Sequence, residues 1–330
     1  MTSKCASKAK WIKLFGCSLL LLIIACTPSP TGNTIALPQE QTQPIEVYFC
    51  PQDDCEQVLV NTLSTSQKSI HCAFFDLDLK SVETILGEKS ATQDVKLVVD
   101  ETNKITIRGP GVRKDTTSQY SHNKFCIIDD HLLITGSMNP TVNGATKNNN
   151  NLLIIESKLL SINYEEEFQE LWAGEFGSGK RVTHPKITLN NKLMENYFCP
   201  EDDCAKHIIN HLKQARNTIH FMTFSFTHEG IADAMLFTKA EVKGIFENRG
   251  AEGKYSQLPR LRDFGINVTK DTNPATMHHK VFIIDNETVI TGSYNPTANG
   301  NKNNDENLMI IHDKKIAGKY LEEFNKVFYQ

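Results

Sequence analysis

The sequence has no excess of basic residues, because its 35 Lys and Arg are outnumbered by 39 Asp and Glu and the formal net charge is −4. A net acidic chain does not favour non-specific binding to nucleic acid, which normally uses a basic face, although a local basic groove remains compatible with this charge. Gly and Pro are also few, at 18 and 12 residues, so the chain is neither collagen-like nor disordered. Its 330 residues allow one large domain or two small ones.

The chain has a single long hydrophobic run, and this run is too short for a good transmembrane span. It extends from Leu14 to Cys26, follows four lysines and is typical of a signal sequence. Its end resembles a bacterial lipobox, in which Cys26 is lipidated and becomes the mature N-terminus. An ordinary cleaved signal and an uncleaved anchor are the alternatives. We expect an exported chain, either a lipoprotein of the bacterial cell envelope or a secreted protein, with a signal at 1–26 and a flexible tether at 27–44.

Two stretches of the sequence are nearly the same although they lie far apart. SHNKFCIIDDHLLITGSMN occupies 121–139, and MHHKVFIIDNETVITGSYN occupies 277–295 at an offset of 156 residues. YFCPQDDC at 48–55 returns as YFCPEDDC at 197–204, at an offset of 149. These matches indicate an internal duplication of one unit.

Each copy has the pattern of a mixed α/β unit. Short runs rich in Val, Ile and Phe, such as SIHCAFF and KFCIID, predict buried strands, and CEQVLVNTLSTS has helical spacing. Strands that alternate with helices predict a sheet covered on both faces. We place repeat one at 45–190 and repeat two at 191–330. We expect them to pair about a pseudo-twofold axis, so that a monomer contains an internal pseudo-dimer.

The duplicated motif keeps a His, a Lys two positions on, and an Asn after Gly-Ser. Lys supplies positive charge, Asn amide donors and Ser a hydroxyl, which together match the oxygens of a phosphoryl group and need no metal. Two histidines permit a two-step reaction, in which one attacks phosphorus and the other serves as acid and then as base. The candidate catalytic residues are His122, Lys124, His278 and Lys280, and the candidate phosphate-binding residues are Ser137, Asn139, Ser293 and Asn295.

The doubled pattern H-x-K-x4-D-x6-G-S-x-N resembles the phospholipase D superfamily of phosphodiesterases over nearly the whole chain after the leader. The compact repeats are most similar to small bacterial endonucleases and mitochondrial cardiolipin hydrolases, which carry one unit per chain and dimerise to build a site. The resemblance implies two α/β sandwich units with the active site at their interface. It also implies that Asp129 and Asp285 hold the site together. We interpret His279, whose counterpart is Asn123, as a neighbour of the site.

The resemblance further implies an acidic residue behind a catalytic His. Glu306 lies 28 residues beyond His278 and fits this role, whereas Asn150 is the matching residue in repeat one. We therefore expect the two histidines to differ in basicity. A carboxylate supports an attacking imidazole better than an amide does, which favours His278 as the nucleophile and His122 as the acid. Related fused enzymes more often use the first His, so both orders stay open.

The cysteines after the leader fall into two groups. Two C-x4-C pairs repeat with the duplication, and local disulfides are favoured over a zinc site because the chain is expected to be exported. These disulfide candidates are Cys50 with Cys55 and Cys199 with Cys204. Cys72 and Cys126 align with Phe221 and Phe282, which predicts that both are buried core thiols.

These observations favour an exported, metal-independent phosphodiesterase that hydrolyses phospholipids at a membrane through a phosphohistidine. One alternative is a non-specific endonuclease, with nucleic acid as the partner. Another is a phosphatidyltransferase of the cardiolipin synthase type, in which a lipid alcohol replaces water. A third is a catalytically silent membrane- or partner-binding protein. All four interpretations involve the same motif residues, and none requires a cofactor.

Overall fold

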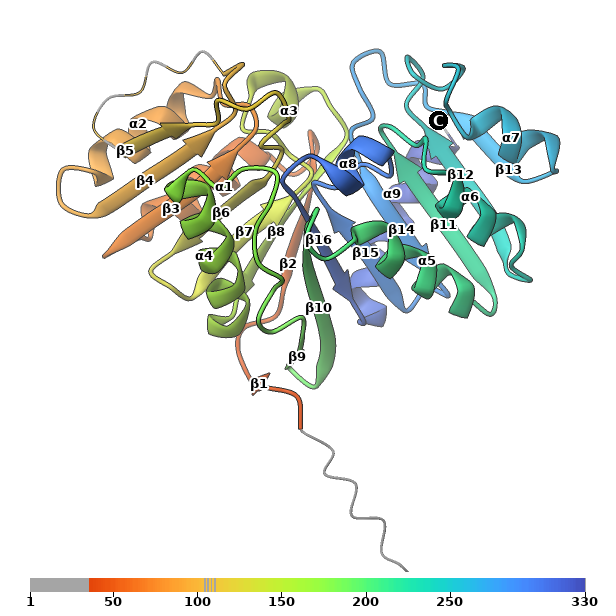
Figure 1. Ribbon diagram of the computed structural model, residues 1–330, viewed down its shortest axis with the longest axis horizontal. Coiled ribbons are helices and arrows are strands. Elements are labelled where there is room, and N and C mark those ends of the chain that lie inside the picture. Colours follow the sequence, from red (N-terminus) through yellow and green to blue (C-terminus); the bar gives the residue numbers. More distant parts are fainter. Residues whose placement is uncertain (1–35, 104, 106, 108, 110, 330) are drawn as a thin grey trace, which may run out of the picture. The chain divides into compact units, whose positions relative to one another are not determined.

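Runs of apolar residues in each repeat build a mixed β-sheet. The computed structural model describes residues 36–103, 105, 107, 109 and 111–329, and residues from Leu37 on form one compact unit (Figure 1). The sheet of repeat one has the order β2-β8-β7-β6-β3-β4-β5. Its strands are β2 (Glu46–Cys50), β3 (Ser69–Phe74), β4 (Asp94–Val99), β5 (Gly111–Lys114), β6 (Lys124–Ile128), β7 (Leu132–Gly136) and β8 (Asn150–Glu156).

The sheet of repeat two has the same central order with two strands added at one edge, β1-β9-β10-β16-β15-β14-β11-β12-β13. Its strands are β1 (Gln39–Glu40), β9 (Lys186–Leu189), β10 (Lys192–Cys199), β11 (Thr218–Thr223), β12 (Glu241–Phe246), β13 (Asn267–Lys270), β14 (Lys280–Ile284), β15 (Thr288–Gly292) and β16 (Glu306–Ile311). The predicted α/β class with two repeated units is confirmed.

Nine helices lie in the described residues. They are α1 (Cys55–Ser64), α2 (Lys80–Lys89), α3 (Val142–Thr146), α4 (Lys158–Ala173), α5 (Cys204–Gln214), α6 (Glu229–Leu236), α7 (Leu258–Asp263), α8 (Ala298–Lys302) and α9 (Lys314–Phe328). The two longest begin at polar caps, since Ser157 accepts from the backbone N–H of Leu160 and Asp313 from that of Ile316. Gly174, at φ 94°, ends α4 in the left-handed conformation.

The helices cover both faces of each sheet, as the sequence predicts. Helices α1 and α2 pack on the outer face of the first sheet, and α5, α6 and α7 on the outer face of the second. Helices α4 and α9 belong to a core that contains strands of both repeats. Across this shared core Tyr164 contacts Phe198 edge to face at 5.0 Å, and the equivalent Tyr320 contacts Phe49 at 5.1 Å.

Reciprocal contacts between the repeats support the pseudo-twofold relationship. Ser121 of repeat one forms a β-bridge with Asp305 of repeat two, and Met277 of repeat two forms the equivalent bridge with Asn149 of repeat one. Each pair becomes the other when 156 is added to one partner and subtracted from the other. The interface is therefore self-complementary, as in a twofold dimer, although both halves belong to one chain.

The N-terminal predictions fall partly outside the described residues. The signal at 1–26, with Cys26, and residues 27–35 of the tether lie there. The prediction of a flexible tether is wrong for residues after that point, because β1 pairs with β9 and the Glu40 carboxylate accepts hydrogen bonds from the backbone N–H of Lys158 and Leu159. Among the described residues, no helix combines the length and the apolar character needed to cross a membrane.

Six cysteines are joined in three disulfides. The structure pairs Cys50 with Cys55 and Cys199 with Cys204 at the start of α1 and α5, and it pairs Cys72 with Cys126 across β3 and β6. Cys72 and Cys126 are buried as predicted, but the prediction of free thiols is wrong.

The physical reason is the register of the central strands. Cys72 lies opposite Cys126 on the antiparallel partner, which brings their Cα atoms to 4.1 Å. In repeat two the same positions hold Phe221 and Phe282, and the strand beyond Phe221 offers Gly244, whose missing side chain leaves room for the ring.

Candidate active site

Both motif histidines are held at the repeat interface by the backbone of the opposite repeat. His122 lies two residues before β6 begins, and its N–H donates to the carbonyl of Asp305 at 2.9 Å. His278 lies two residues before β14, and its N–H donates to the carbonyl of Asn149 at 2.9 Å. Both side chains are buried. Neither repeat alone supplies these contacts, so the site requires both.

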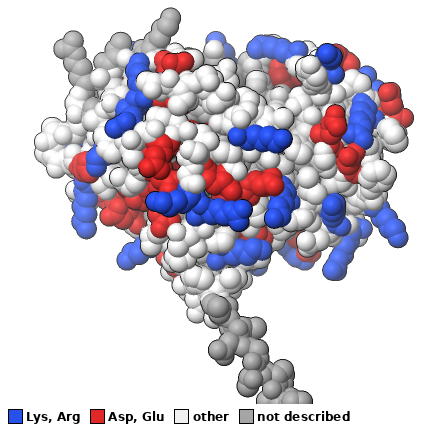
Figure 2. Space-filling model, in the orientation of Figure 1, with Lys and Arg blue, Asp and Glu red and all other residues white. Residues whose placement is uncertain are grey.

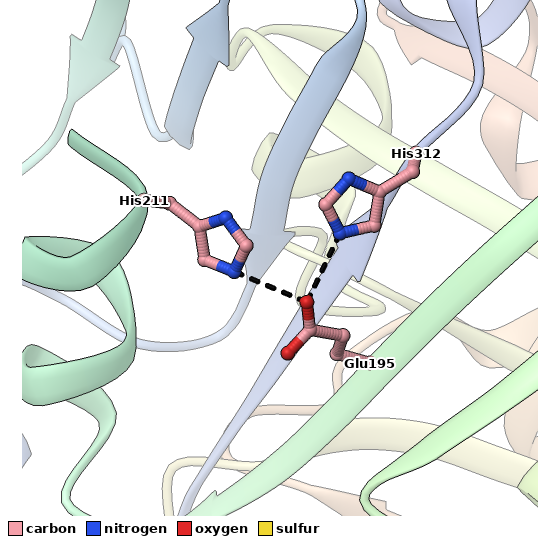
Figure 3. Close-up of side chains that lie close together, drawn as sticks. All are labelled: Glu195, His211 and His312. Carbon is pink, nitrogen blue, oxygen red and sulfur yellow. Dashed lines mark hydrogen bonds and ion pairs between the residues drawn. The ribbon is translucent and has the colours of Figure 1, made fainter. Parts of the chain in front are cut away.

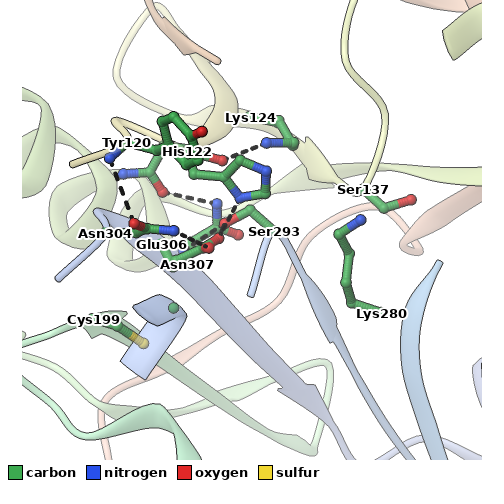
Figure 4. A network of polar contacts seen from close by, with 12 residues as sticks. Tyr120, His122, Lys124, Ser137, Cys199, Lys280, Ser293, Asn304, Glu306 and Asn307 are labelled. Carbon is green, nitrogen blue, oxygen red and sulfur yellow. Dashed lines mark hydrogen bonds and ion pairs between the residues drawn. The ribbon is translucent and has the colours of Figure 1, made fainter. Parts of the chain in front are cut away.

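The side-chain partners of the two histidines also come from the opposite repeat. Nδ1 of His122 lies 2.7 Å from the carboxylate of Glu306 (Figure 4). Nδ1 of His278 lies 2.9 Å from the amide oxygen of Asn150 and 3.1 Å from the carbonyl of Ser137. The amide nitrogen of Asn150 donates to the carbonyl of Gly144, which turns its oxygen toward the imidazole.

The sequence-based pairing of these residues is therefore wrong. The sequence predicts Glu306 behind His278, in its own repeat, and Asn150 behind His122. The structure places each behind the His of the other repeat. The reason is the bridge between Ser121 and Asp305, which places the next residues of the two segments, His122 and Glu306, beside each other. Residue spacing within one repeat carries no information about this crossing.

The lysines and the Gly-Ser-x-Asn turns complete the centre. Lys124 donates to the carbonyl of His122, and Lys280 donates to that of His278 at 2.8 Å. In both repeats the Ser hydroxyl donates to the residue behind the opposite His, Ser137 to Asn150 at 3.0 Å and Ser293 to Glu306 at 2.7 Å. The serines thus orient these residues.

Asn139 and Asn295 lie next to the serines and keep their amide oxygens buried without a hydrogen-bond partner among the described residues. The fold therefore leaves one acceptor unused on each amide, which a donor group of a ligand could reach.

Burial of ionisable groups dominates the electrostatics of the centre. Burial lowers the pKa of Lys124 from 10.5 to about 7, and burial together with repulsion from Lys124 lowers the pKa of Lys280 well below its usual value. Burial and the two lysines lower the pKa of both imidazoles, His122 and His278. Burial raises the pKa of the Glu306 carboxyl to about 8, against the opposing effect of Lys124. An anion that enters this centre would reverse most of these shifts.

Asp129 and Asp285 lie at the far end of the strands that begin near the two histidines. From Lys124 to Asp129 is about 17 Å at 3.4 Å per residue. The Asp129 carboxylate accepts from the backbone N–H groups of Gln67, Lys68 and Ser69, and Asp285 accepts from the equivalent three in repeat two. Although burial opposes it, these hydrogen bonds lower the pKa of Asp129 and of Asp285. This geometry gives both residues a role in fixing β3 and β11.

Sequence reasoning missed two aromatic residues of the site. The ring of Phe75 lies 4.8 Å from the ring of His122, and the ring of Phe224 lies 4.8 Å from that of His278. The same rings lie 5.0 Å from Nζ of Lys124 and 4.8 Å from Nζ of Lys280. Their offset of 149 residues, equal to that of the C-x4-C pairs, is the signal that could have identified them.

His279 lies directly behind the centre. Its side chain is fully buried, Nδ1 lies 3.2 Å from the amide of Asn151, and Nε2 lies 3.6 Å from a carboxylate oxygen of Glu323. In repeat one the matching Asn123 donates to Glu167 at 3.1 Å. These contacts place His279 in the packed interior behind the candidate active site.

One family model matches the chain twice, once in each repeat. The family model described as "Cardiolipin synthase, PLD-like domain" matches residues 59–172 and 208–328. The chain belongs to the phospholipase D superfamily. It is a phosphodiesterase of this superfamily.

Several proteins of known name or structure resemble this chain in part or throughout. A protein named phospholipase D from Rickettsia conorii is 32% identical over 151 residues, which cover 44% of this chain and 76% of that protein. The mitochondrial cardiolipin hydrolase of Xenopus tropicalis is 29% identical over 141 residues, 41% of this chain and 67% of that protein. The crystal structure of phosphatidylserine synthase from Haemophilus influenzae, at 12% identity, superposes with a TM-score of 0.63 over 86% of each chain, which shows the fold.

Proposed function

We propose that this chain is an exported hydrolase of phospholipid phosphodiester bonds that works through a phosphohistidine on His122. The observation that carries the mechanism is the unequal support of two buried imidazoles. His122 is backed by a carboxylate and His278 by an amide and a carbonyl oxygen. In both rings the described contacts engage Nδ1, which leaves Nε2 to face the substrate.

In the first step Nε2 of His122 attacks phosphorus while Nδ1–H donates to the Glu306 carboxylate, which stabilises the charge that the ring acquires. The bond from phosphorus to the headgroup or lipid alcohol breaks, and the departing oxygen takes a proton from Nε2 of protonated His278. Lys124, Lys280 and the two Asn amides bind the unbridged oxygens of the phosphoryl group.

In the second step His278, now neutral, accepts a proton from water, and the water oxygen attacks phosphorus. The bond between phosphorus and Nε2 breaks, and its electron pair returns to His122. A lipid alcohol in place of water would give the transferase reaction. The same residues serve both outcomes, so the products distinguish them.

The aromatic residues beside the histidines favour a lipid. Phe75 and Phe224 contact the two catalytic rings, and Tyr120 packs against Phe75 with 46% of its surface exposed. On the face shown in Figure 2, basic and acidic side chains are interspersed. The relatives named phospholipase D and cardiolipin hydrolase support the same substrate class.

Nucleic-acid cleavage is the second candidate, and one observation favours it. A cavity of about 590 Å³ lies beside the segment that leads to His278 and is lined by polar residues that include Lys147 and Arg249. Nη1 and Nη2 of Arg249 donate to Thr276 and to the carbonyl of Pro274, which holds the guanidinium in place. A phosphate next to the cleaved one could bind there.

The export part of the proposal rests on the leader and on the disulfides. Three disulfides are typical of a protein that folds in an oxidising compartment. If Cys26 is the lipidated residue, metabolic labelling with palmitate should mark the wild-type chain and not a Cys26→Ala variant. Labelling of both would reject a lipid on Cys26.

The test of function compares substrates under one set of conditions. The purified full chain in detergent is incubated with EDTA and labelled phosphatidylglycerol, phosphatidylethanolamine or cardiolipin in vesicles, and with single- and double-stranded DNA and RNA. We expect lipid cleavage, with His122→Asn and His278→Asn each losing at least about 10²–10⁴-fold. His184→Asn is the matched control, because the hydrogen bonds seen at His184 use its backbone.

A pair of rim variants distinguishes the two substrate classes. Phe75→Ala should reduce cleavage of lipid in vesicles more than cleavage of a small water-soluble diester, and the control Phe237→Ala, at an 85% exposed residue, should change neither. Cleavage of nucleic acid but not of lipid, reduced by Arg249→Ala, would overturn the lipid proposal. Failure to cleave any diester would overturn the proposed hydrolysis.

A further inference from the structure

Three side chains of repeat two meet outside the active site (Figure 3). Nε2 of His211 lies 3.1 Å from Oε1 of Glu195, and Nε2 of His312 lies 3.0 Å from the same oxygen. We propose that Glu195, His211 and His312 form a binding site for one divalent transition-metal ion, of which Zn²⁺ is the representative. This inference does not depend on the proposed phosphodiester substrate.

The periodicity of three elements brings the ligands together. Glu195 lies on β10, and its side chain shares a face with Tyr197 and Cys199, because strand residues two apart point the same way. His312 follows β16 directly and continues the face of Ile310, the residue opposite Glu195. His211 lies on α5, seven residues after Cys204 and so on the side of the helix that packs on this face.

The separations between the ligand atoms fit a zinc ion. One ligand atom from each of the three residues can be chosen so that all lie within 4.8 Å of one another. In a tetrahedral site with zinc–ligand bonds of about 2.0–2.1 Å, neighbouring ligand atoms lie roughly 3.3 Å apart. The nitrogen–oxygen separations of 3.0 and 3.1 Å are close to this value. Small rotations of the side chains would place the ion between them, and metal binding would release the protons that now join these atoms.

Neighbouring residues orient the candidate ligands through hydrogen bonds, as is usual around metal sites. Nδ1 of His312 lies 3.0 Å from the hydroxyl of Thr288, which can accept its proton and fix Nε2 as the metal-binding nitrogen. The second oxygen of Glu195, Oε2, accepts from the Tyr197 hydroxyl at 2.7 Å and lies 3.1 Å from Nζ of Lys186. These two contacts leave Oε1 to face the two histidines, in the position of a metal ligand. The Lys186 side chain is 48% exposed and can move into solvent if the ion repels it.

The site also has an open side for a further ligand. A cavity of about 390 Å³ is lined by all three residues and by Asn210 and Thr288. Both imidazoles are partly exposed to this cavity, whereas Glu195 is only 2% exposed. A water molecule in the cavity could therefore act as the fourth ligand beside the three side chains.

Repeat one provides an internal comparison. Glu46 and Tyr48 match Glu195 and Tyr197, and the Tyr48 hydroxyl again donates to the carboxylate. The positions of the two histidines hold Thr62 and Glu156 in repeat one. The Glu–Tyr pair is thus shared by both repeats, whereas the two histidines are particular to repeat two. Repeat one forms the same sheet without them.

The ion would tie α5 and the end of β16 to β10. Glu195 lies four residues, about 13 Å along the strand, from Cys199, which pairs with Glu306 of the catalytic centre. The site is therefore separate from the reacting groups. We expect it to stabilise repeat two and to leave the chemistry unchanged.

The experiment titrates the chelator-treated, untagged full chain with ZnCl₂ in a calorimeter. We expect one ion per chain, and no such binding in His211→Ala or His312→Ala. The matched control is His207→Ala, on the same helix, whose ring stacks on Tyr197 and whose Nε2 bonds the carbonyl of Asp202. The His278→Asn variant controls for zinc at the catalytic histidines. Both controls should keep the ion.

A second readout does not depend on the folding of variants. Zinc at a hundredfold excess over its dissociation constant should raise the unfolding temperature of the wild-type chain by roughly 5 °C. Anomalous scattering at the zinc edge should place the ion between Glu195, His211 and His312. Binding that persists in both His→Ala variants, an ion found only at His122 and His278, or no binding by the wild-type chain would each overturn the proposal.

Discussion

Glu306 contacts Nδ1 of His122 at 2.7 Å although 184 residues separate them, whereas the nearer motif histidine, His278, bonds Asn150 instead. Each motif imidazole is thus oriented from across the repeat interface. The contact decides which ring is better supported when it bonds to phosphorus. It reverses the order of nucleophile and acid that spacing within repeat two favours.

The nucleophile should follow the carboxylate. We expect phosphate on the peptide that contains His122 when the intermediate is trapped by rapid denaturation without acid. In the exchanged variant Asn150→Glu with Glu306→Asn, the phosphate should move to the peptide of His278, because the carboxylate then supports that ring. Phosphate that stays on His122 in the exchanged variant would show that position in the chain, and not the carboxylate, selects the nucleophile.

The pH dependence of kcat/KM should report the Glu306–His122 pair. Below its pKa of about 8 the Glu306 carboxyl holds a proton and donates it to Nδ1, so the ring proton occupies Nε2 and blocks attack. A nitrophenyl diester isolates this pair, because its leaving group departs without a proton from His278, and kcat/KM for that substrate should rise with pH toward about 8.

In Glu306→Gln this rise should move to lower pH, since burial and the lysines lower the pKa of His122 itself, and the plateau should fall by about 10²–10⁴-fold. The exposed Glu322→Gln serves as control. An unchanged profile in Glu306→Gln would assign the rise to another group.

Binding of a phosphate analogue should take up protons. Burial lowers the pKa of Lys124 to about 7, so at pH 8 the empty site holds this amine largely neutral. A bound anion favours the ammonium form and raises its pKa. Calorimetry of vanadate binding at pH 8, in two buffers with different ionisation enthalpies, should show uptake approaching one proton. Lys124→Met should take up less. Proton release on binding would contradict this electrostatic account.

Non-reducing peptide mapping should find three links, Cys50–Cys55, Cys199–Cys204 and Cys72–Cys126. The double variant Cys72→Ala with Cys126→Ala should lower the free energy of unfolding by about 2–4 kcal/mol in urea, since it removes a cross-link and buried volume from the core. Equal stability of the variant and the wild-type chain, or alkylation of native Cys72, would argue against the third link.

The sequence predicts the parts of this molecule that the duplication repeats. The α/β class and the two units follow from alternating apolar residues and from matched offsets, and the structure confirms them. Contacts that cross between repeats are different, because no spacing within one repeat encodes which His Glu306 will meet. Cys72 and Cys126 show the same limit, since burial follows from their alignment with Phe but their pairing depends on strand register. Similarly, His211 and His312 meet only after a helix and a strand pack together.

The interface between the repeats is self-complementary, yet its two halves are written separately in one chain. In a homodimer every substitution appears twice, so a carboxylate behind one His would be matched by a carboxylate behind the other. Covalent fusion removes that constraint. Glu306 and Asn150 could diverge by independent mutation, and the two histidines could specialise, one for attack and one for proton transfer. The duplication therefore allowed a division of labour that a symmetric pair of identical subunits cannot encode.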